Sequence, residues 1–291
     1  MKDKLTIGKI FIIIALTLLV LVTLYPIIYV LSMSLSSAKH ILLQDVTFFP
    51  KEITTASYKM LFKTSDIWVA YRNTILYTVA GTLLGLICTI MIAYSVSQKN
   101  FRYRRVVIWY VMVTMFFSGG VVPLYILINS LGMMNTPWAI ILPGAVSAWN
   151  IVIARTYFAT LPDSLMESAR IDGANEFRIL LSIVVPVAKP ILAVLALYMI
   201  VAYWNTYFSA LLYLDQRPDL LPLQNYLQRL LEQAASTSKS IGAGSTIAET
   251  SQAVEQLKYS AIVVAMFPIM MIYPFLQKYF IKGIMVGSIK E

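Results

Sequence analysis

The chain has 291 residues, of which 59% are hydrophobic and 13% are charged, whereas soluble domains are about 45–50% apolar and about 25% charged. This composition excludes a soluble globular protein and a disordered one. The single cysteine, Cys88, excludes an internal disulfide, and the single histidine, His40, argues against a histidine–cysteine metal site. The net charge of +9 indicates either a nucleic-acid partner or a membrane topology, depending on where the basic residues lie.

Uncharged intervals predict six transmembrane helices. A charge near the bilayer centre costs about 2.5–3.5 kcal/mol, and about 20 helical residues cross the hydrocarbon. The longest uncharged interval, 106–154, is long enough for two crossings, with a turn around Asn129–Gly132 and Asn135–Pro137. The predicted spans are 10–35, 73–97, 106–129, 137–159, 187–214 and 259–279.

The first of these spans is interpreted as a true transmembrane helix rather than a cleaved signal peptide, because its apolar stretch exceeds the roughly 7–15 residues of a signal core. Six spans place both termini on one side. The nine net positive charges then divide into +8 on the side of the termini and +1 over the segments 36–72 and 215–258. The positive-inside rule therefore predicts cytoplasmic termini and two external segments. The basic charge reflects topology and not a nucleic-acid partner.

Two short features are interpreted as structural. The basic loop 99–105 resembles a binding patch, but an anchor facing anionic lipid head groups is the favoured interpretation. Gly81 and Gly85 form a GxxxG pair, which is typically a helix-packing signal.

The predicted cytoplasmic segment 161–189 is the informative one because it is amphipathic. Ser164 and Glu167 fit a capping box at the start of a helix, and Gly173 predicts a bend between two short helices. From the residues alone, a helix lying on the membrane surface and a docking element for a cytoplasmic partner are equally favoured. The apolar face is predicted to comprise Met166, Ala169, Gly173, Phe177, Leu180 and Val184.

The same segment carries Glu167, Ala169, Gly173, Ile183 and Pro186 in one register. This arrangement resembles the EAA loop of ABC importer permeases, whose pattern is Glu-Ala-Ala, three residues, Gly, nine residues and Ile-x-Leu-Pro. The chain departs from the pattern at two positions, with Ser168 in place of an Ala and Val185 in place of the Leu.

Ala93-Tyr94-Ser95, Trp204-Asn205 and the tail 280–290 extend the resemblance to the maltose-type sugar permeases, in particular the second-permease subfamily that works with lipoprotein-anchored binding proteins. The resemblance implies an all-α integral membrane protein with six transmembrane helices, the type I ABC importer permease fold and a cytoplasmic EAA coupling helix at about 163–182. It implies ATPase-coupling roles for Glu167, Ser168, Ala169, Asp172, Gly173 and Pro186.

The implied assembly contains a second homologous permease, two copies of a cytoplasmic ABC ATPase and an extracellular sugar-binding lipoprotein, in a bacterial plasma membrane. The chain itself would be a non-catalytic subunit that binds no cofactor and no metal, because ATP and Mg belong to the ATPase. The mechanism that follows is alternating access driven by ATP.

Aromatic and amide side chains of the fifth span are predicted to line a pathway for a carbohydrate. Tyrosine and tryptophan also form belts at the membrane interface, and this alternative applies most directly to Tyr207, near the outer end. A buried amide such as Asn205 requires a polar partner or a cavity. The candidate pathway residues are Trp204, Asn205, Tyr203, Tyr207 and, from the fourth span, Asn150.

The outer segments 36–72 and 215–258 are predicted to face the binding protein, with a short amphipathic helix at 220–231. Two other functions compete with that of an importer subunit. A stand-alone secondary transporter or channel usually carries ionisable residues inside its spans, and spans two to five have none in their interiors. A membrane-embedded transferase needs convergent acids, histidines or a metal site, and the only acid cluster is the one in the EAA-like segment.

Overall fold

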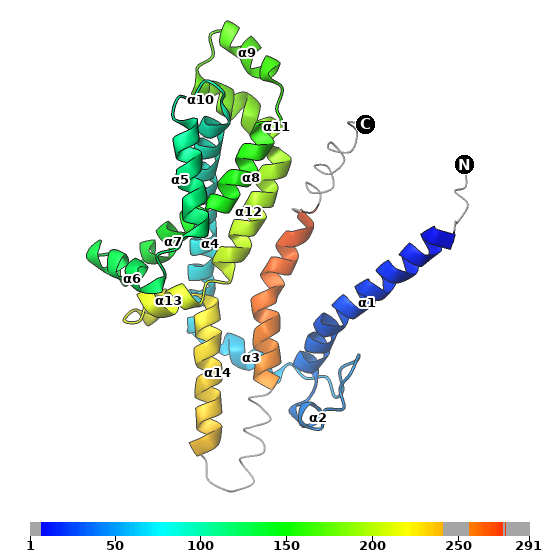
Figure 1. Cartoon of the computed structure of the whole chain (residues 1–291). Coiled ribbons are helices and arrows are strands. Elements are labelled where there is room, and N and C mark those ends of the chain that lie inside the picture. Colours follow the sequence, from blue (N-terminus) through cyan, green and yellow to red (C-terminus); the bar gives the residue numbers. More distant parts are fainter. Residues whose placement is uncertain (1–6, 241–255, 276, 278–291) are drawn as a thin grey trace. The chain divides into compact units, whose positions relative to one another are not determined.

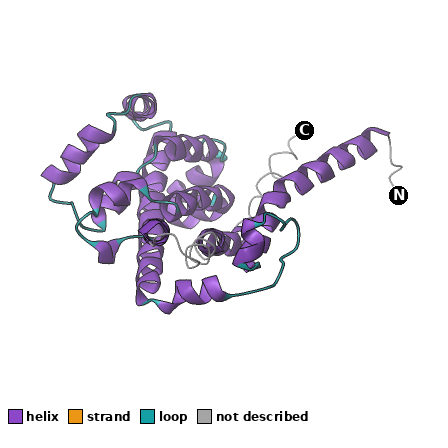
Figure 2. Ribbon diagram, turned by 90° about the horizontal axis from the view of Figure 1, so that it is seen from below, coloured by secondary structure: helices purple, strands orange, loops and turns teal. Residues whose placement is uncertain are grey.

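The structure is a computed structural model that describes residues 7–240, 256–275 and 277. Every regular element among these residues is a helix (Figures 1 and 2). Contacts divide the chain into two compact units, which are described separately. The first consists of the described residues within 1–67 and 226–268, and the second of those within 68–225 and 269–291.

The first unit contains α1 (Ile7–Leu35), α2 (Ala38–Leu42), α3 (Ala56–Lys63) and most of an apolar helix at Gln256–Phe275. Its apolar side chains along α1 are exposed, as expected of a helix that faces lipid. Small polar residues join its elements. Ser57 and Ser260 share a hydrogen bond of 2.6 Å, and the Gln256 amide donates to the Ser36 carbonyl at 2.9 Å. Such side chains bridge helices where lipid offers no hydrogen bonds.

The segment after α1 is folded back on that helix. The Thr54 amide donates to the carbonyl of Leu35, and the Ser32 hydroxyl donates to the carbonyl of Phe48 at 2.7 Å. Within the segment, Asp45 accepts hydrogen bonds from the His40 ring and the Lys51 ammonium. Residues 36–54 of the predicted outer segment therefore form an ordered loop.

The second unit is built around α4 (Ser65–Ser97), whose first residues belong to the first unit. In Figure 1, α9 lies at one end of this unit and α13 lies toward the other. Its remaining elements are α5 (Arg104–Phe116), α6 (Val121–Ser130), α7 (Trp138–Ala145), α8 (Ala148–Phe158), α9 (Asp163–Ile171), α10 (Glu176–Ile179), a π-helical turn (Leu180–Val184), α11 (Val185–Val187), α12 (Lys189–Trp204), α13 (Phe208–Tyr213), a 3-10 turn (Pro218–Leu220) and the start of α14 (Leu223–Ser240).

By length and apolar composition, three helices of the described chain can cross a membrane, and the number is six if each bent pair is one span. The three continuous helices are Gly8–Leu35, Ser65–Ser97 and Gln256–Phe275. The bent pairs are α5 with α6 at 116°, α7 with α8 at 43°, and Glu176–Val187 with α12 at 84°.

The breaks have identifiable local causes that a count of uncharged residues does not reveal. The predicted span 106–129 is divided at Phe117–Gly120, where Gly120 has a φ of +83°, a conformation that favours glycine. The predicted span 187–214 ends as a helix at Trp204 and resumes as α13. At the other end of α12, Pro190 lacks the amide that would continue the preceding helix, and the chain bends at Ala188.

The GxxxG pair of α4 packs against other helices, as the sequence predicts. A Cβ atom on Gly81 would overlap the ring of Tyr203, and one on Gly85 would lie 2.9 Å from the carbonyl oxygen of Ala145. Two glycines on one face therefore allow α12 and α7 to approach α4 closely.

Candidate functional site

The EAA-like segment forms α9, which begins at Asp163 with Pro162 as its N-cap. No side chain caps this N-terminus. The predicted capping box of Ser164 and Glu167 is therefore wrong, because the helix starts two residues earlier than that motif requires. Glu167 instead lies in the second turn of α9 with an exposed side chain.

The predicted bend at Gly173 is confirmed as the C-terminal end of α9. The amide of Gly173 donates to the Arg170 carbonyl, and the amide of Ala174 donates to the Ala169 carbonyl at 2.9 Å. This pair of hydrogen bonds is the Schellman motif, which requires a left-handed residue at the position of Gly173. Its φ of +79° satisfies the requirement, and the chain then turns into α10.

One face of α9 is anchored and the other is free. Met166 and Ala169 are buried in the hydrophobic core of the second unit, together with Leu180 and Val184 from the π-helical turn. Glu167 and Ser168 are exposed, as is Asp172 at the C-cap. The amphipathic prediction is wrong at Gly173 and Phe177, which are exposed, because the turn ends one helix and starts another with a different orientation.

A polar network holds α9 against the end of α4. Arg170 donates to Glu176 at 2.9 Å and to the side-chain oxygen of Gln98 at 3.1 Å, and the Tyr94 hydroxyl donates to Glu176 at 2.6 Å. Lys99 pairs with Asp163 at 2.6 Å, and this hydrogen bond raises the pKa of the lysine. Sequence periodicity does not reveal this network, because the turn at Gly173 brings together residues six apart.

The structure places Pro186 in α11, between the π-helical turn and the bend that leads into α12. Its side chain is exposed. Proline removes one backbone donor from a helix, and π-helical turns often occur where helical hydrogen bonding is interrupted. The anchored face of α9 therefore connects to α12 through a short, bent segment.

The candidate pathway residues of α12 are not all accessible. Tyr203 is buried against Gly81 and Gly144, and its hydroxyl donates to the Ile141 carbonyl at 2.8 Å. Trp204 is also buried, with its ring centre 6.4 Å from that of Tyr71. Both side chains thus contribute to packing within the second unit.

Asn205 and Tyr207 lie beyond the end of α12 and are exposed. The Asn205 amide donates to the Val201 carbonyl one turn back at 2.8 Å, which leaves its oxygen available. Asn150 is mostly buried in α8, and its backbone amide donates to Ser147 at the N-cap. The structure brings Tyr203 and Trp204 into the core and leaves Asn205 and Tyr207 at its surface.

The start of the segment 215–258, the second predicted outer segment, is fixed to α4 by three side-chain hydrogen bonds. Asn73 donates to the Asp219 carbonyl at 2.7 Å, Thr74 accepts from the Leu223 amide at 2.7 Å, and Tyr77 donates to the Leu220 carbonyl at 2.7 Å. The amphipathic helix predicted at 220–231 is observed as α14 from Leu223 to Ser240. Residues 241–255 of this segment and the family-like tail 280–290 lie outside the described residues.

The part of the chain that the structure describes gathers no three His, Cys, Asp or Glu side chains that could hold a metal ion. The arrangement is an exposed acidic helix, anchored at one end of a bundle of bent membrane helices. Its chemistry is that of a contact surface.

The apolar helices and bent pairs define a multi-pass membrane protein. Residues 81–286 match the family of binding-protein-dependent transport system inner membrane components, and the chain belongs to that family. The prediction of an all-α permease fold is thereby confirmed.

Individual relatives match along almost the whole chain. The polygalacturonan/rhamnogalacturonan transport system permease protein YtcP of Bacillus subtilis is 33% identical over 93% of each chain, and Protein LplC of the same organism is 35% identical over 92% of this chain and 90% of its own. A crystal structure of a bacterial ABC transporter involved in the import of the acidic polysaccharide alginate contains a chain that is 33% identical. It superposes with a TM-score of 0.82 and covers 94% of this chain and 96% of its own.

Proposed function

We propose that this chain is a permease subunit of an ATP-driven, binding-protein-dependent carbohydrate importer, and that it forms half of the translocation pathway with a second homologous permease. A carbohydrate substrate is supported by the relatives YtcP and the alginate-importer chain, which are similar along more than nine-tenths of this chain. The proposed partners also include two copies of a cytoplasmic ABC ATPase and an extracellular sugar-binding lipoprotein.

The observation that carries the proposal is the division of α9 into an anchored face and a free face. Met166 and Ala169 fix one side in the core, and Arg170 joins the helix to α4 through Glu176 and Gln98. The free side presents the carboxylate of Glu167. A helix held this way transmits a push or pull on its outer face to the membrane helices rather than rotating by itself.

The proposed mechanism is alternating access. ATP binding would close the ATPase dimer, the docked α9 helices of the two permeases would move together, and the shared cavity would open outward. ATP supplies the energy, which reaches the permease through contacts of the ATPase that differ between two states of the permease, and this chain hydrolyses nothing. In this proposal both termini and α9 are cytoplasmic, which is supported by the +8 net charge of that side.

Asn205 and Tyr207 are the favoured pathway residues of this chain, because their side chains are exposed beyond the end of α12. Tyr203 and Trp204 would act indirectly by fixing the helix that carries them. The ordered outer loop 36–54 and helix α14 are proposed to face the binding protein. Cross-links from residues 223–232 to lipid only, and never to the binding protein, would contradict this assignment.

The coupling role is tested in membranes that contain the whole importer. Glu167→Ala removes the exposed carboxylate of α9, and Gly173→Asp forces a side chain into the left-handed position that ends this helix. We expect each variant to reduce recovery of the ATPase with the permease or substrate-stimulated ATP hydrolysis. Glu232→Ala, which removes an exposed carboxylate of α14, is the matched control and should leave recovery of the ATPase unchanged. Unchanged assembly and hydrolysis in both α9 variants would refute the coupling role.

The substrate class is tested by uptake and by ATP hydrolysis in reconstituted vesicles with the cognate binding protein. The panel contains oligosaccharides from polygalacturonan, from alginate and from neutral maltodextrin. We expect stimulation by at least one carbohydrate and a loss of uptake in Asn205→Ala. A carrier that transports without an ATPase in the vesicle would instead support the stand-alone transporter.

A further inference from the structure

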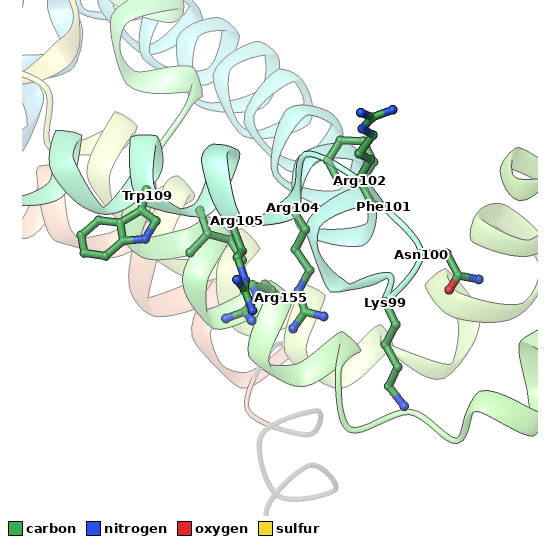
Figure 3. Close-up of a pocket in the computed structure, with 9 residues that line it drawn as sticks. Lys99, Asn100, Phe101, Arg102, Arg104, Arg105, Trp109 and Arg155 are labelled. Carbon is green, nitrogen blue, oxygen red and sulfur yellow. The ribbon is translucent and has the colours of Figure 1, made fainter.

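A cavity of about 640 Å³ lies beside the first turn of α5, next to the α4–α5 loop. Arg104 and Arg105 from α5 and Arg155 from α8 line it, together with Trp109. Figure 3 shows the side chains of the three arginines extending to the same side, whereas that of Arg102 points away from them. Two elements far apart in the sequence thus contribute cations to one cavity.

Within the described part of the chain, the three arginines have no negative partner. Among the described residues, Lys99 pairs with Asp163 on the side of α9, but Arg104, Arg105 and Arg155 form no ion pair. The Nε atom of Arg155 is buried and has no hydrogen-bond partner in the described part of the chain. Because like charges repel and a buried donor without a partner costs free energy, an anion in the cavity would stabilise this arrangement.

The donor set suits a phosphate group. Planar guanidinium groups bind phosphate oxygens in pairs of parallel hydrogen bonds, and they are less strongly hydrated than an ammonium group. The first-turn amides of α5, a helix of 13 residues that begins at Arg104, add partial positive charge at the same place.

The surface beside the cavity identifies a lipid as the source of the phosphate. Val106, Tyr110 and Val113 follow one another on one face of α5, and their side chains are 68%, 72% and 47% exposed. Trp109, at the edge of the cavity, is 69% exposed, and tryptophan favours the boundary between head groups and hydrocarbon. A lipid whose phosphate occupied the cavity would therefore place its acyl chains along the apolar face of α5.

We propose that this cavity is a binding site for the phosphate of an anionic phospholipid, held by Arg104, Arg105 and Arg155. It is a discrete site between α5 and α8, in contrast to a diffuse attraction of the basic loop to the membrane surface. The proposal rests on the cavity and its membrane setting and does not depend on the transported substrate.

The test measures binding of phosphatidylglycerol and phosphatidylcholine to the purified full chain by native mass spectrometry. Each arginine near an anionic surface contributes about fivefold in affinity, so Arg104→Gln with Arg155→Gln should weaken phosphatidylglycerol binding by about 25-fold. Lys59→Gln with Lys63→Gln removes two exposed charges from α3 and should leave binding unchanged. Equal affinity of the wild-type chain for the two lipids, or equal weakening in both double variants, would overturn the proposal.

Two further arms keep the proposal falsifiable if the arginine variant fails to fold. Phosphatidylglycerol with brominated acyl chains should quench tryptophan fluorescence of the wild-type chain more than brominated phosphatidylcholine does, and Trp109→Phe should abolish the difference. A difference that persists in Trp109→Phe would place the lipid elsewhere. Inorganic phosphate at about 10 mM should not displace phosphatidylglycerol, and full displacement would show that the site selects free phosphate instead.

Discussion

The hydroxyl of Tyr203 donates a hydrogen bond of 2.8 Å to the backbone carbonyl of Ile141, and it thereby joins α12 to α7. This contact lies beneath the exposed end of α12, where Asn205 and Tyr207 are found. Tyr203, an aromatic residue of a type that commonly contacts sugars, forms a hydrogen bond that links two membrane helices.

Tyr203→Phe should destabilise the second unit modestly. The change removes one buried hydrogen bond and keeps the ring in place, so we expect a loss of about 1 kcal/mol in the free energy of unfolding. Unfolding of the purified full chain in detergent measures this loss. Tyr198→Phe, at an exposed position of α12, is the control and should change the stability much less. A loss of sugar uptake without any loss of stability would instead favour a direct contact with substrate.

Gly81→Ala should destabilise the chain although alanine favours helix. The added methyl group would overlap the ring of Tyr203, and overpacking of this kind typically costs about 1–3 kcal/mol. Gly8→Ala, at a helical position with no atom within 4 Å of the added carbon, is the matched control and should be neutral or slightly stabilising. Equal stability of the two variants would show that the ring moves aside without cost.

Arg170→Ala should weaken coupling more than it weakens folding. The variant removes the hydrogen bonds to Glu176 and Gln98, whereas exposed ion pairs contribute only about 0–1 kcal/mol to stability. We expect reduced substrate-stimulated ATP hydrolysis in the whole importer at nearly unchanged assembly. Arg178→Ala, an exposed arginine of α10, removes the same charge two residues beyond Glu176 and should retain stimulation. Equal stimulation in the two variants would exclude a role for the network.

The loop 36–54 should loosen at acidic pH. Hydrogen bonds from His40 and then Lys51 lower the pKa of Asp45 from its ordinary value. A lowered folded-state pKa means that the stabilisation is present above the ordinary carboxyl pKa of about 3.9 and is lost as the pH falls through the lowered value. Hydrogen exchange of the loop amides at pH 7, 5 and 3, expressed as protection relative to the intrinsic exchange rate at each pH, should show reduced protection only at pH 3. Asp45→Asn should already show reduced protection at pH 7, and protection equal to wild type there would contradict the assignment.

The helical, membrane-spanning character of the chain could be predicted from composition because the cost of placing a charge in lipid is large and independent of neighbours. The site was predictable to the level of α9, since the position of Gly173 follows from a local backbone requirement. The attachment of α9 to α4 could not be predicted, because Arg170 and Glu176 come together only after the chain turns at Gly173.

The sequence also does not predict which aromatic residues of the fifth span are buried and which are exposed. Tyr203 and Tyr207 are four residues apart and would share a face of a continuous helix, but α12 ends at Trp204. One is consequently buried against glycine and the other is half-exposed. Similarly, the bend between α5 and α6 depends on Gly119 and Gly120, which a count of uncharged residues does not weigh.

That bend has a consequence for the chain in its bilayer. The 13 residues of α5 rise by only about 20 Å, against a hydrocarbon thickness of about 30 Å, so the break at Phe117–Gly120 falls short of a full crossing. The four residues of the break are exposed, and their backbone lies outside regular helical hydrogen bonding. Since lipid offers no hydrogen bonds to such a backbone, the break has to face water or protein rather than acyl chains.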